Sequence, residues 1–450
     1  MTSNLFRQSK LPLAITLFTA MAGSVQAAPP AFQDTRALGM GGTGVAAARP
    51  SGAGLHNPSL LAAEHSDWYD GFNMTLPSVN ARFADDEDTI DQVDDVQDTI
   101  DELDAILSGL DADNLTQANI SNAGEQAGRL ESQLNALDGA AVRFDVGAGT
   151  LFAVPDRTLG VSLHITAQGR GTVEGTVSQD DTSPLGDLNE ASNESDPQDA
   201  LTQAQSALNE LLDSDGRLRD LNSEGRVLAS AVLEAGLSFA GTLDVANQPV
   251  QLGVTPKVQN LRTFDFVANV NTFDEDDFDA DEFETDETYF NLDMGASTTL
   301  GSADQWRFGA VVRNLIPRTL ETAEDNGSEL DDRFQREEMR LDPMVTLGIA
   351  HQSAWHTITA DIDVTQNKGI GQMADRQYLA LGGEINLLDW VQVRGGVRQN
   401  IDGDTGGDGI EEETQFTGGL ALSPWALRAE IGALVSNEEV GGSAEFGLAF

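Results

Sequence analysis

The amino-acid sequence predicts an all-β fold, a transmembrane antiparallel β-barrel of about fourteen strands. Three observations lead to this prediction. From Ala140 to the end of the chain, apolar and polar side chains alternate with a period of two, as in strands with two different faces. The connections between these strands alternate between tight turns and long, acidic segments. The last segment also alternates and terminates on phenylalanine.

The first 27 residues are predicted to be a secretory signal. Arg7 and Lys10 precede an apolar stretch from Leu11 to about Ala22, and Val25-Gln26-Ala27 forms a small-residue cleavage site. No apolar run of about 18 residues follows this signal. If the exported chain enters a membrane, it must therefore do so as a closed barrel, formed by residues 66–450.

Composition limits the classes of protein that fit. The 450 residues include 74 acidic and 25 basic side chains, and the formal net charge is −49. Because nucleic acid repels such a chain, no nucleic-acid partner is expected, and the acidity is typical of a halophilic or marine source. The chain contains no cysteine, which excludes disulfides and thiolate chemistry.

Fourteen segments carry the strand pattern. In residues 306–313, for example, Trp306 and Phe308 share one face, whereas Arg307 and Arg313 share the other. A soluble sandwich alternates in the same way, so periodicity alone does not decide between sandwich and membrane barrel. The predicted strands are 66–80, 140–154, 158–178, 226–241, 248–267, 284–300, 304–315, 341–353, 355–366, 375–387, 389–401, 413–423, 424–435 and 441–450.

The connections favour the membrane barrel. Short turns at one end and long loops at the other are typical of outer-membrane barrels. The long connections are predicted at 81–139, 179–225, 268–283, 316–340 and 402–412. Apolar residues at helical spacing, such as Leu103 and Leu107 in the first connection and Leu208 and Leu211 in the second, predict acidic helices. We expect these helices to pack on one another and cap the outer rim.

The polar faces of the strands are predicted to line the lumen with charges of both signs. Ion pairing across neighbouring strands is the expected role of these charges, and a selectivity ring is the alternative. The lumen-facing candidates are Arg143, Asp145, Arg170, Asp293, Arg307, Arg313, Asp361, Asp363, Glu384, Arg394 and Arg398.

No catalytic constellation, cofactor site or metal site is predicted. His65, Ser66 and Asp67 are consecutive and cannot align as a triad, and His351 and His356 only flank a short turn. In the acidic segment, Asp277, Asp279 and Asp281 begin an EF-hand-like spacing, but Glu282 occupies the glycine position. We therefore expect no enzyme activity and no bound metal.

The final segment, SAEFGLAF, places Phe446, Leu448 and Phe450 on one face. This pattern resembles the segment by which bacterial outer-membrane barrels are delivered to their insertion machinery. The resemblance implies that the partners of this chain are the barrel-assembly machinery, outer-membrane lipid and lipopolysaccharide.

Residues 38–44, LGMGGTG, contain the pattern G-x-G-x-x-G at Gly39, Gly41 and Gly44. A dinucleotide site requires a strand before these glycines, but residues 28–37 hold two prolines and no β-branched run. Residues 32–62 instead resemble the amino-terminal segment of FadL-like outer-membrane proteins, in which a glycine-rich stretch precedes N-P-[AS]-x-[LI].

The chain is still more similar to the TraF-like family of conjugal or plasmid transfer proteins, because WRFGAVVRNLIPR and DPMVTLGIAH, followed by ADIDVTQN, accompany the glycine motif. The resemblance implies that residues 28–65 fold into the lumen as a hatch. The hatch candidates are Gly39, Gly41, Gly42 and Gly44, which would approach the wall closely, and Asn57 and Pro58, which would form the turn into the first strand.

The same resemblance implies a function in the outer membrane of a Gram-negative bacterium: passive passage of a small hydrophobic molecule past the hatch. An anionic rim repels fatty carboxylates, so neutral or aromatic molecules are the expected ligands. The alternative is a non-transporting surface component of plasmid conjugal transfer that contacts partners through its acidic helical loops. A secreted soluble sandwich is a third possibility.

Overall fold

The structure is a computed structural model that describes residues 33–64, 71–85, 89–110, 116–213, 216–245, 247–269, 280–300, 305–324, 336–367, 369, 375–401 and 414–450. The predicted signal at 1–27 lies outside these residues, as do His65 and most of the acidic connections 268–283 and 402–412. Within the described part, no helix is long and apolar enough to cross a membrane.

Fourteen antiparallel strands close into one barrel, in which β1 pairs with β16. This confirms the predicted fold class and strand number. The strands are β1 (Asn73–Asp85), β2 (Ala141–Val154), β3 (Gly160–Thr176), β4 (Glu224–Val245), β5 (Gln248–Asn269), β6 (Glu284–Leu300), β7 (Trp306–Arg313), β10 (Met344–Gln352), β11 (His356–Asp363), β12 (Tyr378–Leu388), β13 (Val391–Asn400), β14 (Gln415–Leu422), β15 (Leu427–Val435) and β16 (Glu439–Ala449).

The first strand differs from the predicted 66–80. β1 runs from Asn73 to Asp85, and its register shifts between Thr75 and Ser78, around Pro77. The prediction ended too early because this irregularity interrupts the alternation, which then resumes with Arg82 buried and Phe83 exposed.

The outer surface of the barrel is apolar. On β3, Leu163 and Ile165 are 40% and 48% exposed, whereas Ser162 and His164 between and beside them are buried. Four tryptophans, Trp306, Trp355, Trp390 and Trp425, are exposed at the rim formed by the short turns. An apolar band bordered by aromatic residues is the surface that lipid covers in bacterial outer-membrane barrels.

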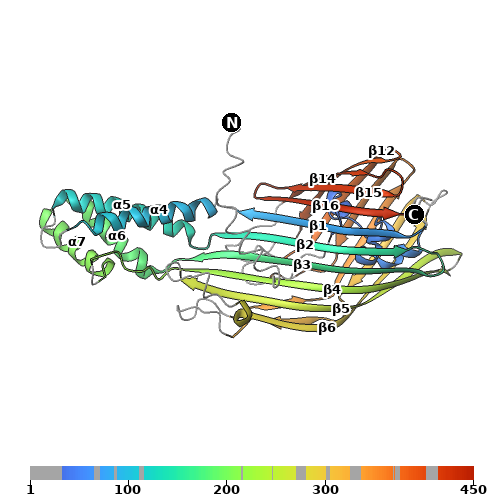
Figure 1. Cartoon of the computed structure of the whole chain (residues 1–450), viewed down its shortest axis with the longest axis horizontal. Helices are drawn as coiled ribbons and strands as arrows, with labels where there is room; N and C mark the ends of the chain where they lie inside the picture. Colours follow the sequence, from blue (N-terminus) through green and yellow to red (C-terminus); the bar gives the residue numbers. More distant parts are fainter. Residues whose placement is uncertain are drawn as a thin grey trace.

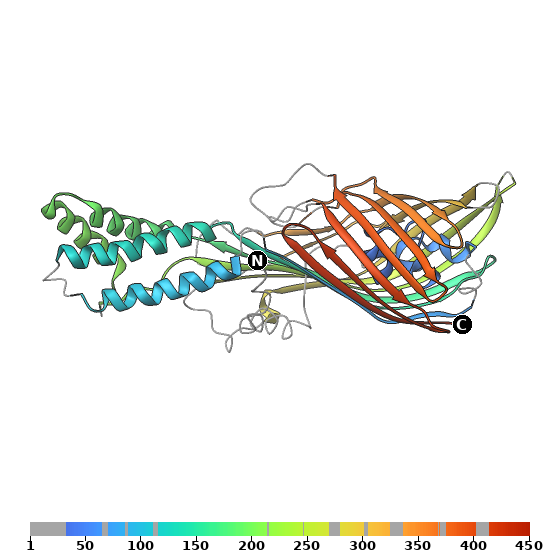
Figure 2. The same cartoon turned by 90° about the horizontal axis from the view of Figure 1, so that it is seen from above.

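An amino-terminal plug fills part of the lumen. It consists of α2 (Thr35–Gly39), α3 (Pro50–His56) and the 3-10 helix η1 (Pro58–Ala62). Figures 1 and 2 show these short helices inside the barrel, in the half nearer the carboxyl terminus. Between them, the three elements contact strands on opposite sides of the wall, since η1 packs on β4 to β6 and α2 on β13 to β16.

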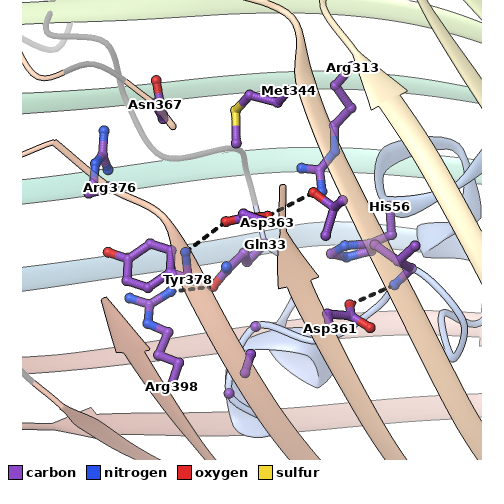
Figure 3. Close-up of a pocket in the computed structure, with 15 residues that line it drawn as sticks. Gln33, His56, Arg313, Met344, Asp361, Asp363, Asn367, Arg376, Tyr378 and Arg398 are labelled. Atoms are coloured by element: carbon purple, nitrogen blue, oxygen red, sulfur yellow. Dashed lines mark hydrogen bonds between the residues drawn. The ribbon is translucent and has the colours of Figure 1, made fainter. Parts of the chain in front are cut away.

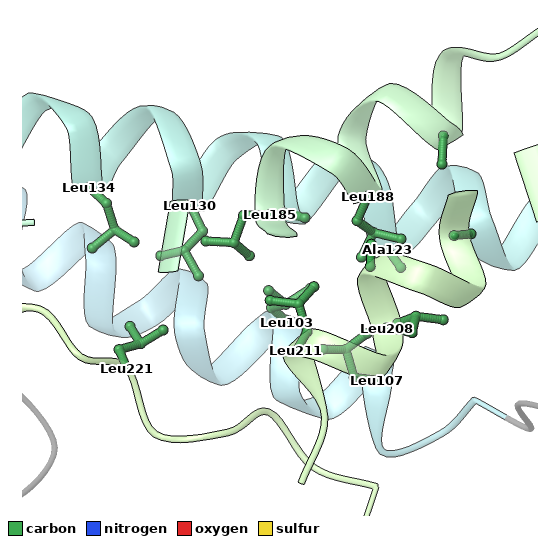
Figure 4. Close-up of a cluster of buried hydrophobic side chains, with 14 of the residues drawn as sticks. Leu103, Leu107, Ala123, Leu130, Leu134, Leu185, Leu188, Leu208, Leu211 and Leu221 are labelled. Atoms are coloured by element: carbon green, nitrogen blue, oxygen red, sulfur yellow. The ribbon is translucent and has the colours of Figure 1, made fainter. Parts of the chain in front are cut away.

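The two predicted helical connections form one four-helix tower. Its helices are α4 (Thr89–Leu107), α5 (Gln117–Leu137), α6 (Gln179–Asn193) and α7 (Pro197–Leu211). They share a core that includes Leu103, Leu130, Leu188 and Leu208 (Figure 4). The tower projects beyond the rim instead of capping it, as Figures 1 and 2 show.

Two further details of the long connections differ from the prediction. The second connection, in which Leu208 and Leu211 predicted helix, holds two helices: α7 ends at Leu211, and α6 precedes it despite Pro184 within its sequence. The connection at 316–340 contains a two-stranded sheet of β8 (Arg318–Glu321) and β9 (Glu338–Leu341). Strands of four residues are too short for alternation to reveal. A short helix, η4 (Ala280–Phe283), precedes β6.

Candidate functional site in the barrel lumen

The plug and the wall meet backbone to backbone at glycines. Gly41 has φ +73°, and a Cβ atom there would stand 2.9 Å from the carbonyl oxygens of Leu381 and Val397. On the wall, a Cβ atom at Gly382 or Gly396 would collide with the plug backbone at Met40 and Gly41. No side chain fits on either side of this contact. This contact, and not a dinucleotide site, explains why the segment contains glycines.

The other hatch candidates also contact the wall or each other. Gly39 packs on Gly419 of β14, Gly42 has φ +86°, and a Cβ atom at Gly44 would lie 2.6 Å from the His56 ring. The backbone N–H groups of Gly44 and Val45 donate to Asp361 Oδ2 on β11, at 2.7 and 2.9 Å. Asp361 thus holds the glycine-rich turn to the wall.

Asn57 links α3 to η1, Pro58 is the first residue of η1, and both are buried against Gly295 of β6 and Gly253 of β5. The Asn57 Nδ2 group donates to the carbonyl oxygens of Val45, at 2.8 Å, and Ala296, at 3.3 Å. Its Oδ1 atom accepts from the Ser59 backbone N–H and caps η1. The turn was expected at the exit of the plug, but it instead joins two plug helices to β6.

Two plug arginines enter a buried ion network on the wall. Arg36 donates twice to Glu384, at 3.0 and 3.1 Å, and Arg49 contacts both Glu384 and Glu430. Arg394 bridges the same two glutamates from β13. These five residues, which we call the plug latch, are each at most 7% exposed. The latch joins the plug to β12, β13 and β15.

Glu384 and Arg394 were predicted from the sequence, whereas Arg36, Arg49 and Glu430 were not. The two arginines could have been found, because an arginine in a segment expected to lie within the lumen requires a buried carboxylate as its partner. Asp34, which caps α2, is a further buried carboxylate of the plug. Burial alone would raise its pKa, but His56, 3.6 Å away, and the hydrogen bond from the Ala37 N–H hold the pKa well below its usual value.

The remaining lumen-facing candidates are mostly paired across strands. Asp145 accepts two hydrogen bonds from Arg170 and lies within 4 Å of Arg82 and Arg143. Asp293 pairs with Lys257 at 2.9 Å. Arg307 donates to the backbone oxygen of Glu64 at the end of the plug, at 2.6 Å. Structural pairing therefore accounts for most of these charges.

Arg313, Asp361, Asp363 and Arg398 instead surround a small cavity between the plug and strands β7 to β13 (Figure 3). Its volume is about 70 Å³. An apolar cavity of about 150 Å³ holds benzene, so this polar cavity is too small for an aromatic molecule unless the plug moves. The cavity is lined by Gln33, Gly41, Gly42, Val45, His56, Arg313, Met344, Thr346, Asp361, Asp363, Asn367, Arg376, Tyr378, Ala380 and Arg398.

An apolar cluster lies in the lumen between the plug and the long-loop rim. Leu228, Val232 and Leu261 occupy lumen-facing positions of β4 and β5, and the β8–β9 hairpin covers them with Leu320, Met339 and Leu341. The Thr263 hydroxyl donates to the Glu321 carbonyl at 3.3 Å and fixes the hairpin against the wall. We call this set the lumenal apolar cluster; neither it nor the hairpin was predicted.

The chain is similar to known proteins in its sequence and in its fold. A family model described as "F plasmid transfer operon, TraF, protein" matches residues 54–363. No curated protein matches the chain.

Solved structures with a similar fold include the toluene transporter TodX of Pseudomonas putida, which is 10% identical. That alignment covers 93% of this chain and 98% of TodX, with a TM-score of 0.48. A FadL homologue from Pseudomonas aeruginosa is 13% identical over 95% of this chain and 98% of its own, with a TM-score of 0.47.

Proposed function

The chain belongs to the family described as F plasmid transfer operon, TraF, protein, and we propose that this member is a passive outer-membrane channel for small, neutral hydrophobic molecules. The lumenal apolar cluster carries the proposal. Six apolar side chains face one another inside the lumen. A barrel that was permanently closed, or that passed ions, would have no use for them, whereas a hydrophobic ligand binds to such a surface.

The first step is binding under the hairpin. Besides the apolar cluster, the contacts between the β8–β9 hairpin and the wall include the Thr263 hydrogen bond, an ion pair between Arg226 and Glu337 at 3.7 Å, and the Arg318 guanidinium 4.8 Å from the centre of the Tyr289 ring. A hydrophobic molecule that inserts between the hairpin and the wall keeps the apolar surfaces of both covered. Exchange of one apolar contact for another has a small free-energy cost.

The second step is passage of the plug. The plug is held by hydrogen bonds and ion pairs and by an apolar cluster that joins Leu61 of the plug to Ala153 and Ala240 of the wall, and water can replace the polar contacts when the plug shifts. The acidic rim excludes anions, which restricts the ligand to neutral molecules. In this proposal the concentration gradient of the molecule drives its movement.

The experiment measures uptake of the fluorescent probe N-phenylnaphthylamine into cells whose lipopolysaccharide leaflet otherwise slows its entry. The wild-type chain should accelerate uptake, and the double variant Leu228→Asn, Leu261→Asn should reduce the acceleration by about tenfold, the effect of roughly 1.4 kcal/mol. Leu228→Met, Leu261→Met keeps the apolar surface and should retain uptake. Equal uptake by both pairs would refute the proposal, provided that both migrate as folded barrels.

The tower favours a second candidate function, a surface component that binds a partner. The 17 buried core residues that the structure describes there give the tower a fold of its own outside the lumen, which a channel does not need. Because α4–α5 and α6–α7 share one core, removal of a single hairpin would expose that core. Replacement of both 89–137 and 179–211 by short linkers tests this function: uptake should persist, and loss of a co-purifying protein would support the partner-binding function.

A further inference from the structure

Two histidines converge on the outer surface of the barrel, at the turn between β10 and β11. The Nδ1 atom of His351 lies 3.0 Å from the Nε2 atom of His356, and the two rings are stacked with an angle of 14° between them. Both side chains point outward, because the neighbouring Ala350 and Thr357 face the lumen and are buried. This pair is separate from the plug, the cavity and the lumenal apolar cluster.

The separation of the two nitrogens matches a metal chelate. Two nitrogens that each lie about 2.0 Å from one ion are about 2.8 Å apart in square-planar geometry and about 3.3 Å apart in tetrahedral geometry. The observed 3.0 Å falls between these values. Loss of the proton between the two nitrogens would leave a lone pair on each of them.

The surroundings orient the rings as they do in metal sites. The Ser353 hydroxyl lies 2.7 Å from His356 Nδ1, so this nitrogen can donate to it and leave Nε2 as the free ligand atom. Trp306 packs edge-on against His351 with 4.8 Å between the ring centres, and Trp355 packs in the same way against His356 with 4.1 Å between the ring centres. The rings are therefore fixed before any ion binds.

We propose that His351 and His356 form a binding site for a divalent transition metal ion such as Cu²⁺, Ni²⁺ or Zn²⁺ at the short-turn rim, with water completing the coordination. Imidazole nitrogen is a preferred ligand of these ions. Among the described residues, no third His, Asp or Glu joins the pair. The site thus offers two protein ligands and open positions, which gives moderate affinity and free exchange.

Tryptophan fluorescence tests the site, because bound Cu²⁺ quenches nearby indoles and two of the five tryptophans contact the histidines. The untagged, detergent-solubilised full chain is titrated with Cu²⁺ in excess Mg²⁺, which occupies the many surface carboxylates. We expect saturable quenching at one equivalent. Zn²⁺, which does not quench, should compete with Cu²⁺ and restore the fluorescence.

Three variants distinguish this site from adventitious binding. His351→Asn and His356→Asn should each weaken the affinity at least about tenfold, and Ser353→Ala by about tenfold through loss of ring orientation. His164→Gln alters a buried lumenal histidine and should leave the titration unchanged. Heat-modifiable migration in gels confirms that each variant is folded. If folded His351→Asn and His356→Asn proteins are quenched like the wild type, the proposal is wrong.

Discussion

At the scale of single residues, the lumen is organised by glycines and by charges that are buried in pairs. The dinucleotide-like spacing of Gly39, Gly41 and Gly44 has a steric origin, because the plug backbone lies directly on the wall. Which residues face the lumen was predictable from alternation. Their partners were not, because Glu384 and Arg36 are 348 residues apart and alternation carries no information about register.

Gly41→Val tests the steric contact. A β-branched side chain at φ +73° costs about 1–3 kcal/mol, and its Cβ atom would stand 2.9 Å from two wall oxygens. We expect the plug to be displaced and probe uptake to rise, with the barrel itself intact. Uptake and heat-modifiable migration measure the two effects separately. A variant with unchanged uptake and unchanged thermal stability would show that the plug does not rest on the wall at Gly41.

Arg49→Met tests the plug latch. Removal of one partner leaves Glu384 and Glu430 buried with less compensation, and such losses cost about 3–5 kcal/mol. We expect a lower temperature for proteolytic release of the plug. Arg157→Met is the matched control: Arg157 pairs with plug residue Glu64 at 2.9 Å, but both side chains are more than half exposed. It should change stability by less than about 1 kcal/mol. Equal effects of the two variants would contradict the latch.

At the scale of elements, an element could be predicted from the sequence where it has one apolar face and one polar face and is long enough for the pattern to repeat. Barrel strands have an apolar outer face and a polar lumenal face, so their period-two pattern was visible and all fourteen were found. β8 and β9 have four residues each and show no such pattern. The helices were indicated by apolar spacing, but spacing within each connection could not reveal that both connections share one core.

Leu103→Ala tests the independence of the tower. Leu103 is fully buried among tower side chains, and its truncation should cost about 2–5 kcal/mol. We expect proteolysis of the tower at a protease concentration at least about 30-fold lower than the wild type requires, which corresponds to about 2 kcal/mol. The barrel should keep its heat-modifiable migration. Ala105→Gly, an exposed position on the same helix, controls for helix propensity and should cost about 1 kcal/mol. Loss of the barrel together with the tower would show that the two are one folding unit.

At the scale of the whole molecule, the tower, the β8–β9 hairpin and the plug follow one another along one axis. The tower stands outside the rim, the hairpin covers the lumenal apolar cluster, and the plug occupies the half nearer the short turns. The proposed function therefore requires the plug to move relative to the wall. The family resemblance implied a hatch from the sequence, whereas the inward-folded hairpin became visible only in the structure.

A plug that is covalently fixed to the wall tests this central claim most directly. Ser59 of η1 and Ser297 of β6 face each other, and their hydroxyl oxygens are 2.9 Å apart. Two side chains that meet in this way can be joined by a disulfide when both are replaced by cysteine, and the chain has no other cysteine. In the Ser59→Cys, Ser297→Cys variant, oxidation should abolish probe uptake and reduction should restore it, while both single variants take up probe under either condition. Undiminished uptake by the oxidised, cross-linked protein would contradict a channel gated by its plug.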